Sequence, residues 1–173
     1  MSNKFDEILR SVAEESFASL AFMLPVDPDG PVETHPGPPI VASISFDGPM
    51  EGVLFLAVST GIVPELASNM LGLDVAEGPA SPDQEQDALK ELLNVICGNL
   101  LPEIAGREAI FNVDAPAIAS ESSLPETYGH HDPAAGASLC LDAGEARLVL
   151  FISSEEVTAV PPKKGTRKDS MAT

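Results

Sequence analysis

Four residues near the middle of the sequence have the types and spacing of a polar site on one face of a helix. Glu91 and Asn94 are three residues apart, while Asp87 and Gly98 lie four residues before and after them. Steps of three and four residues align side chains along a helix. A carboxylate can pair with a partner's cation, and an amide can donate to and accept from the same water molecule.

Two of these residues are unfavourable in an exposed helix. Glycine costs about 1 kcal/mol relative to alanine there, and Gly98 is best explained if a partner approaches the backbone closely. Asn94 is a weak helix former because its amide competes for backbone hydrogen bonds. These residues suggest a docking surface. The alternative is an ordinary solvated face, which composition and spacing alone favour because Glu and Asn often occur at this spacing by chance.

The element that positions these residues is a long helix predicted from Ser81 to about Ala105. Ser81 and Gln84 have the spacing of a capping box, and Pro82 falls where a missing N–H costs nothing. Its apolar stripe, which must face a sheet, comprises Leu89, Leu92, Leu93, Ile96, Leu100 and Ile104. The polar residues therefore point to solvent.

The remaining elements predict an α+β fold in which helices pack on an antiparallel sheet. A first helix is expected at 5–24, ended by Pro25, and a short one at 62–71. Hairpins are expected at 40–46 with 50–59 and at 137–142 with 145–153, with a mostly extended segment at 109–122. Similar stretches recur 77 residues apart, which predicts two pseudo-repeated halves.

The motif and its surroundings resemble the CheC/CheX/FliY chemotaxis phosphatases. The family pattern is an acidic residue or serine, then Glu, then Asn, then a downstream proline; here these are Asp87, Glu91, Asn94 and, after 21 intervening residues, Pro116. The similarity covers roughly residues 5–155. In the first helix the motif is broken, because Phe17 or Ala18 stands where asparagine would be. The chain therefore resembles CheX-like members with one active helix.

The resemblance implies a phosphatase acting on the aspartyl phosphate of a phosphorylated CheY-like response regulator, in chemotaxis or another two-component pathway. Asn94 would orient the attacking water, and Glu91 would pair with the invariant lysine of the receiver. Asp87 would support docking at the rim, with Gly98 in the same surface. The chain would need no cofactor or metal of its own, since the receiver supplies Mg²⁺. CheX-like members also imply a homodimer.

Length and charge bound the alternatives. The 173 residues suit one domain, expected at 1–160, with a disordered basic tail at 161–173. The last eleven residues carry +3, which leaves −21 on the rest given a net charge of −18. Nucleic acid and anionic membranes are therefore poor partners. With neither a membrane-length apolar run nor a signal-peptide pattern, we expect a cytoplasmic protein.

Other residues with chemical potential have simpler explanations. Cys97 and Cys140 are far apart and are expected to be small buried apolar side chains. His130, His131 and Asp132 lie in a predicted loop between Gly and Pro, which is a poor scaffold for the strict geometry of a metal site.

Two other functions stay open at this point. The chain could be a non-catalytic module of the same fold that docks on a receiver or on the flagellar switch. It could also be a structural dimerisation domain without a receiver partner. Measurements of phosphate release and of receiver binding would distinguish the phosphatase, the docking module and the structural domain.

Overall fold

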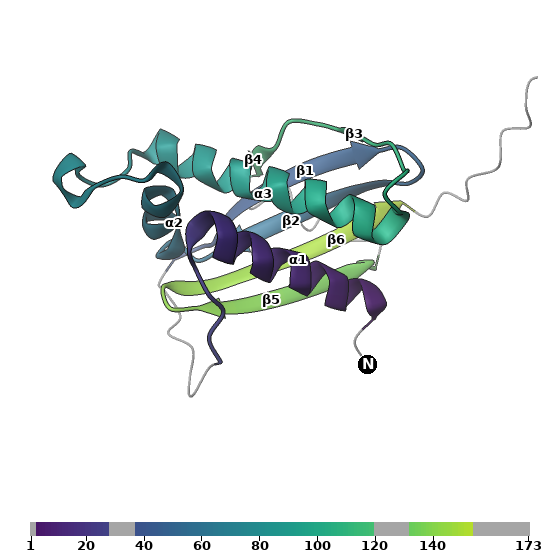
Figure 1. Ribbon diagram of the computed structural model, residues 1–173, viewed down its shortest axis with the longest axis horizontal. Helices are drawn as coiled ribbons and strands as arrows, with labels where there is room; N and C mark the ends of the chain where they lie inside the picture. The colour runs from purple at the N-terminus through teal and green to yellow at the C-terminus, as the bar shows by residue number, and fades with distance from the viewer. Residues whose placement is uncertain (1–2, 28–36, 120–131, 154–173) are drawn as a thin grey trace, which may run out of the picture.

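The computed structural model describes residues 3–27, 37–119 and 132–153, and forms two layers. Figure 1 shows the helices lying across one face of the sheet, with α1 and α3 side by side and α2 at one end. The helical elements are α1 (Lys4–Ala21), α2 (Ile62–Leu71), the short 3-10 helix η1 (Val75–Glu77) and α3 (Pro82–Ala105). The strands are β1 (Ile40–Asp47), β2 (Glu51–Val58), β3 (Asn112–Val113), β4 (Ala117–Ala119), β5 (Ala135–Leu141) and β6 (Gly144–Ser153).

The sheet is antiparallel throughout, as predicted for an α+β fold. Its strand order is β3-β1-β2-β6-β5, and β4 also pairs with β1. The two predicted hairpins are confirmed: β1 pairs with β2, β5 pairs with β6, and β2 and β6 join them at the centre. Apolar residues alternate along β6, so that Ala146, Leu148 and Leu150 are buried beneath the helices.

The start of α3 confirms the cap predicted from the sequence. The backbone N–H of Gln84 donates to Ser81 Oγ at 3.2 Å, and the N–H of Ser81 donates to Gln84 Oε1 at 2.9 Å. Pro82 occupies the first helical position. The predicted apolar stripe packs into the core; Ile104 is half-buried, whereas the other five residues are fully buried. Pro102 lies inside the helix, which continues to Ala105.

The first helix ends earlier than predicted. It stops at Ala21 because Phe22 adopts a left-handed conformation, with φ 54°, three residues before Pro25. The N–H of Met23 donates back to the carbonyl of Phe17 at 3.1 Å, so the chain folds back on the last turn of the helix. The amide of Asn69 on α2 donates to the carbonyl of Ala21 at 2.7 Å. Tertiary contacts therefore end this helix, and the proline does not.

The two long helices cover opposite halves of the sheet. α1 packs on β5 and α3 packs on β1, and the two helices also contact each other. One core unites Leu9 and Phe17 of α1, Leu92 and Ile96 of α3, and the strands beneath them. The predicted relation between two repeated halves stays a prediction, because the shared architecture does not by itself demonstrate a repeat.

Side chains of α1 cover the free edge of β5. The N–H of Gly136 donates to Asp6 Oδ1 at 2.9 Å, and Arg10 donates to the carbonyl of Ser138 at 3.0 Å. An unpaired strand edge is a template for pairing with another chain. The first turns of α1 therefore both anchor the helix and shield this edge.

Three predictions fall wholly or largely outside the described residues. These are the tail at 161–173 with its boundary near 160, the histidine pair at 130–131, and most of the loop that contains this pair and precedes the hairpin predicted to begin at 137. The end of that loop is assigned differently, since β5 begins at Ala135. The predicted extended segment at 109–122 contains only the short strands β3 and β4 among its described residues.

Candidate functional site

All four residues of the predicted docking surface are exposed on α3. Asp87, Glu91, Asn94 and Gly98 are open to solvent. The adjoining positions that face the sheet, such as Leu92, are buried. The helix thus presents a carboxylate and an amide outward, one turn apart, from a rigid base.

Three of these four residues line one groove, with a volume of about 640 Å³, between α3 and the chain that follows it. Along α3 the groove is lined by Asp87, Lys90, Glu91 and Asn94, and opposite them by Val113, Asp114, Ala115 and Pro116. The structure therefore brings the predicted Pro116 to the site, while Gly98 lies farther along the helix. Lys90 and Val113 also line the groove, although the sequence motif did not include them.

The wall opposite α3 contains an irregularity in strand pairing. Phe46 of β1 pairs with Val113, whereas Ala42 pairs with Ile118. The register therefore shifts by one residue between β3 and β4, so Ala115 and Pro116 share the place opposite a single residue of β1. Proline has no N–H for a regular ladder and is tolerated at such bulges. Pro116 directly precedes β4.

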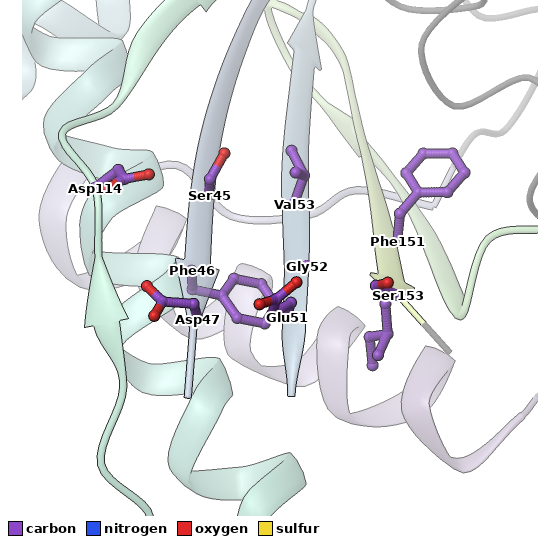
Figure 2. A pocket seen from close by; sticks show the side chains of 10 residues that line it. Ser45, Phe46, Asp47, Glu51, Gly52, Val53, Asp114, Phe151 and Ser153 are labelled. Atoms are coloured by element: carbon purple, nitrogen blue, oxygen red, sulfur yellow. The ribbon is translucent and has the colours of Figure 1, made fainter. Parts of the chain in front are cut away.

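Asp114 also belongs to a second hollow, on the sheet face away from the helices. Figure 2 shows Ser45, Val53 and Phe151 on neighbouring strands, with Asp114 turned toward Ser45. The N–H of Asp114 donates to the carbonyl of Ser45 at 2.9 Å, which fixes this segment against β1. Val113, paired with the core residue Phe46, is therefore the side chain that this wall turns toward α3.

The groove contains one ion pair within α3. Lys90 Nζ lies 3.1 Å from Asp87 Oδ1, and the exposed fractions of the two side chains are 33% and 74%. The lysine stem is thus partly packed, whereas the carboxylate is open to a partner. Glu91, the acid next to Asn94, takes part in no ion pair among the described residues.

Gly98 has no packing role in the described structure. A Cβ added to it would meet nothing within 4 Å, so the fold does not require glycine here. Residue 102 is proline, which lacks the N–H that would normally donate to the carbonyl of Gly98. This helix turn therefore offers a partner a bare backbone surface and an acceptor oxygen without its usual helical donor.

Burial decides which residues of α1 correspond to the motif of α3. Phe17 is fully buried, whereas Asn94 is exposed, so the alignment that matches these two residues puts them in different environments. Shifting by one residue matches Ser11 and Glu15, both exposed, to Asp87 and Glu91. The half-buried Ala18 then stands where α3 has its amide.

The two cysteines are free and give no sign of chemistry at the site. Cys97 is buried in α3, and burial raises the pKa of its thiol to about 11, so it stays protonated at neutral pH. Cys140 is half-buried instead of fully buried as predicted, since it lies near the edge of the sheet. Among the described residues, no three or more His, Cys, Asp or Glu side chains are grouped to hold a metal ion.

Comparison with known proteins places the chain in a family. Residues 40–134, just over half of the chain, match the model of the family "Chemotaxis phosphatase CheX", so the chain belongs to that family. The matched region contains all of α3 and Pro116. Among proteins with curated descriptions, none matches this sequence.

Solved structures confirm the fold. A CheX from Desulfovibrio desulfuricans is 12% identical, with a TM-score of 0.59 over 87% of this chain and 99% of that one. A CheX from Vibrio vulnificus is 15% identical, with a TM-score of 0.57 over 87% and 97%. A complex of CheX with CheY, BeF3 and Mg²⁺ from Borrelia burgdorferi gives a TM-score of 0.61 at 13% identity, over 86% and 97%.

Within the part of the chain that the structure describes, no helix combines the length and apolar character needed to cross a membrane.

Proposed function

We propose that this protein stimulates hydrolysis of the aspartyl phosphate of a CheY-like response regulator, with Asn94 as the residue that acts on the attacking water. The exposed amide of Asn94, at the edge of an open groove on a rigid helix, carries the proposal. Membership of the chemotaxis phosphatase family supports it, as does the CheX–CheY complex of Borrelia burgdorferi.

In this reaction the protein forms no covalent bond to the substrate. Water attacks phosphorus, the bond between phosphorus and the aspartyl oxygen breaks, and inorganic phosphate leaves a free carboxylate on the receiver. One water proton remains on the phosphate and the other is released to phosphate or solvent. Because the leaving group is a carboxylate, the rate depends mainly on placing water in line. An amide can hold that water without adding negative charge beside the phosphoryl group.

Glu91 fixes the docking pose in this proposal. It lies one turn before Asn94 on the same face and would pair with a lysine of the receiver. Asp87 would strengthen docking from the rim, and the backbone at Gly98 would let the receiver approach the helix closely. The receiver, not this chain, would hold Mg²⁺.

The proposal is tested by timing phosphate release from a phosphorylated receiver in Mg²⁺, with wild type and with Asn94→Ala. We expect the variant to lose stimulated dephosphorylation by about 100-fold or more, as for removal of a group that acts in the transition state. Binding to the receiver carrying BeF3 should stay nearly unchanged. Undiminished phosphate release by Asn94→Ala would refute the mechanism.

The same assay separates the enzyme from a non-catalytic docking module. A module would bind the receiver without shortening the lifetime of its phosphate in the wild-type protein. If the wild-type protein bound none of the response regulators of the same cell, a purely structural domain would be favoured instead.

The family resemblance further leads us to propose a homodimer that acts in the cytoplasm in chemotaxis or a related two-component pathway. Light scattering of the purified chain tests the dimer. A chain that stays monomeric across the micromolar range would refute the proposed homodimer without affecting the proposed chemistry.

A further inference from the structure

Lys90 introduces a positive charge beside the amide of Asn94. The two residues are four positions apart on α3, so they are neighbours on its surface, and both line the groove. The lysine side chain is 33% exposed. Its stem is therefore held on the helix, while its ammonium group lies at the groove where Asn94 would meet a receiver.

The surrounding charges make this position unusual. The chain carries a net charge of −18, and Asp87 and Glu91 place two carboxylates on the α3 side of the groove. A phosphoryl group brings about −1.5 to −2 further charges. Among the residues that the structure describes, Lys90 is the one cationic residue that lines this groove. Without Lys90, the carboxylates at this groove would repel a phosphorylated receiver more strongly than an unphosphorylated one.

The ion pair with Asp87 does not prevent Lys90 from meeting an anion. Lys90 Nζ is 3.1 Å from Asp87 Oδ1, and the aspartate is 74% exposed. Exposed ion pairs within a helix are weak, so a second anion can compete for the ammonium group. A lysine suits this exchange because its charge is compact and its stem is flexible.

We propose that Lys90 makes the groove discriminate between phosphorylated and unphosphorylated receivers, by placing its ammonium against the phosphoryl group that Asn94 approaches. This inference rests on the proposed function, since it concerns the same groove. It makes Lys90 a specificity residue for the charge state of the partner, distinct from Glu91, which would contact the receiver in both states.

The test measures receiver affinity in two charge states. Each CheY-like response regulator of the same organism is purified and titrated with and without BeF3 and Mg²⁺, against wild type, Lys90→Gln, Lys90→Arg and Lys4→Gln. Lys4→Gln is the matched control, because it removes the same charge from an exposed position outside the groove. We expect Lys90→Gln to lower the preference for the BeF3 form by about five- to tenfold, the scale of one charge-assisted contact.

The other variants sharpen the result. Lys90→Arg should keep most of the preference, and Lys4→Gln should keep all of it. Raising the ionic strength should reduce the wild-type preference toward the value of Lys90→Gln. An equal loss of affinity for both receiver forms in Lys90→Gln would mean that the lysine only orders the helix surface, and would overturn the proposal. An unchanged preference would overturn it as well.

Failure of this inference can be told apart from failure of the proposed function. If Asn94→Ala abolishes phosphate release while Lys90→Gln keeps its preference, only the role of Lys90 is wrong. If wild type binds none of the receivers, both proposals are wrong.

Discussion

Helices α1 and α3 lie side by side on the same face of the sheet, yet only α3 displays the complete polar motif. Both begin with a capping box, and both bury an apolar stripe in the same core. When they are aligned by burial, Ser11 and Glu15 match Asp87 and Glu91, while Ala18 matches Asn94. The difference is a single amide.

The surroundings differ more than the motif does. The Asn94 side of α3 faces a wall made by residues 113–116, where the strand register shifts. Ser11 and Glu15 instead line a groove whose other wall includes Asn99, Pro102 and Arg107 from α3 and the turn after it. The same helix spacing therefore serves different surfaces. A motif is informative only together with the chain segment that it faces.

The largest expected difference between the helices concerns stability. Phe17 is fully buried among α1, α3 and the sheet, so Phe17→Ala should lower the free energy of unfolding by about 3–5 kcal/mol. Asn94→Ala should change it by only a few tenths of a kcal/mol, because Asn94 is exposed. Urea denaturation of both variants measures the contrast. Similar losses in the two would show that Asn94 is a packing residue.

The next difference concerns docking. Glu91→Ala should weaken binding of the BeF3-treated receiver by about tenfold or more, because a desolvated charged contact would be lost. Glu15→Ala, the matched control on α1, should leave binding nearly unchanged. Its helix has Ala18 in place of the amide of Asn94 and does not face the wall formed by residues 113–116. Isothermal titration of both variants compares them. A greater loss in Glu15→Ala would move the docking surface to α1.

Much of this fold could be predicted because its signals are local. The cap at Ser81, the stripe from Leu89 to Ile104 and the two hairpins depend on residues close in sequence, and these predictions are confirmed. The end of α1 was predicted wrongly, because the left-handed Phe22 and the bond from Asn69 depend on tertiary packing. No local pattern near Pro25 carries that information.

The site shows the same division between local and distant information. The shared face of Asp87, Glu91 and Asn94 follows from helix spacing alone. The placement of Val113 beside them requires the pairing of β3 with β1, between residues more than sixty positions apart. Lys90 was within reach of sequence reasoning, since it is four residues from Asn94. Its place at a groove still depends on residues 113–116, which are brought to α3 only by the fold.

A smaller effect distinguishes Gly98 from every packed position on α3. Gly98→Ala should stabilise the fold by about 0.5–1 kcal/mol, because alanine is the better helix residue and its Cβ would meet open space. The same variant should weaken receiver binding if the backbone at this turn is approached closely. Thermal denaturation and receiver titration of the same sample measure the gain in stability and the loss of affinity. A variant that is more stable and binds as well as wild type would remove Gly98 from the docking surface.

The smallest expected effect separates the two caps. Asp6 closes the capping box of α1, and its pKa is lowered chiefly by the hydrogen bond from the backbone N–H of Gly136 and then by that of Asn3. A carboxylate with a lowered pKa in the folded state stabilises it above the unfolded pKa, near 3.8, and this contribution is lost as the pH falls through the folded value. The cap of α3 uses Gln84, which does not titrate.

Acid should therefore loosen the start of α1 and its hold on the β5 edge before it affects the start of α3. An NMR titration of the Asp6 carboxyl carbon should give a pKa below 3.8. The protection of the Gly136 amide against hydrogen exchange, taken relative to its intrinsic rate at each pH, should fall as Asp6 is protonated, while the protection of the Ser81 amide should not. In Asp6→Asn the pH dependence at Gly136 should shrink, because the side-chain oxygen can still accept but no longer titrates. An Asp6 pKa at or above 3.8 would contradict the hydrogen bonds that tie α1 to the sheet edge.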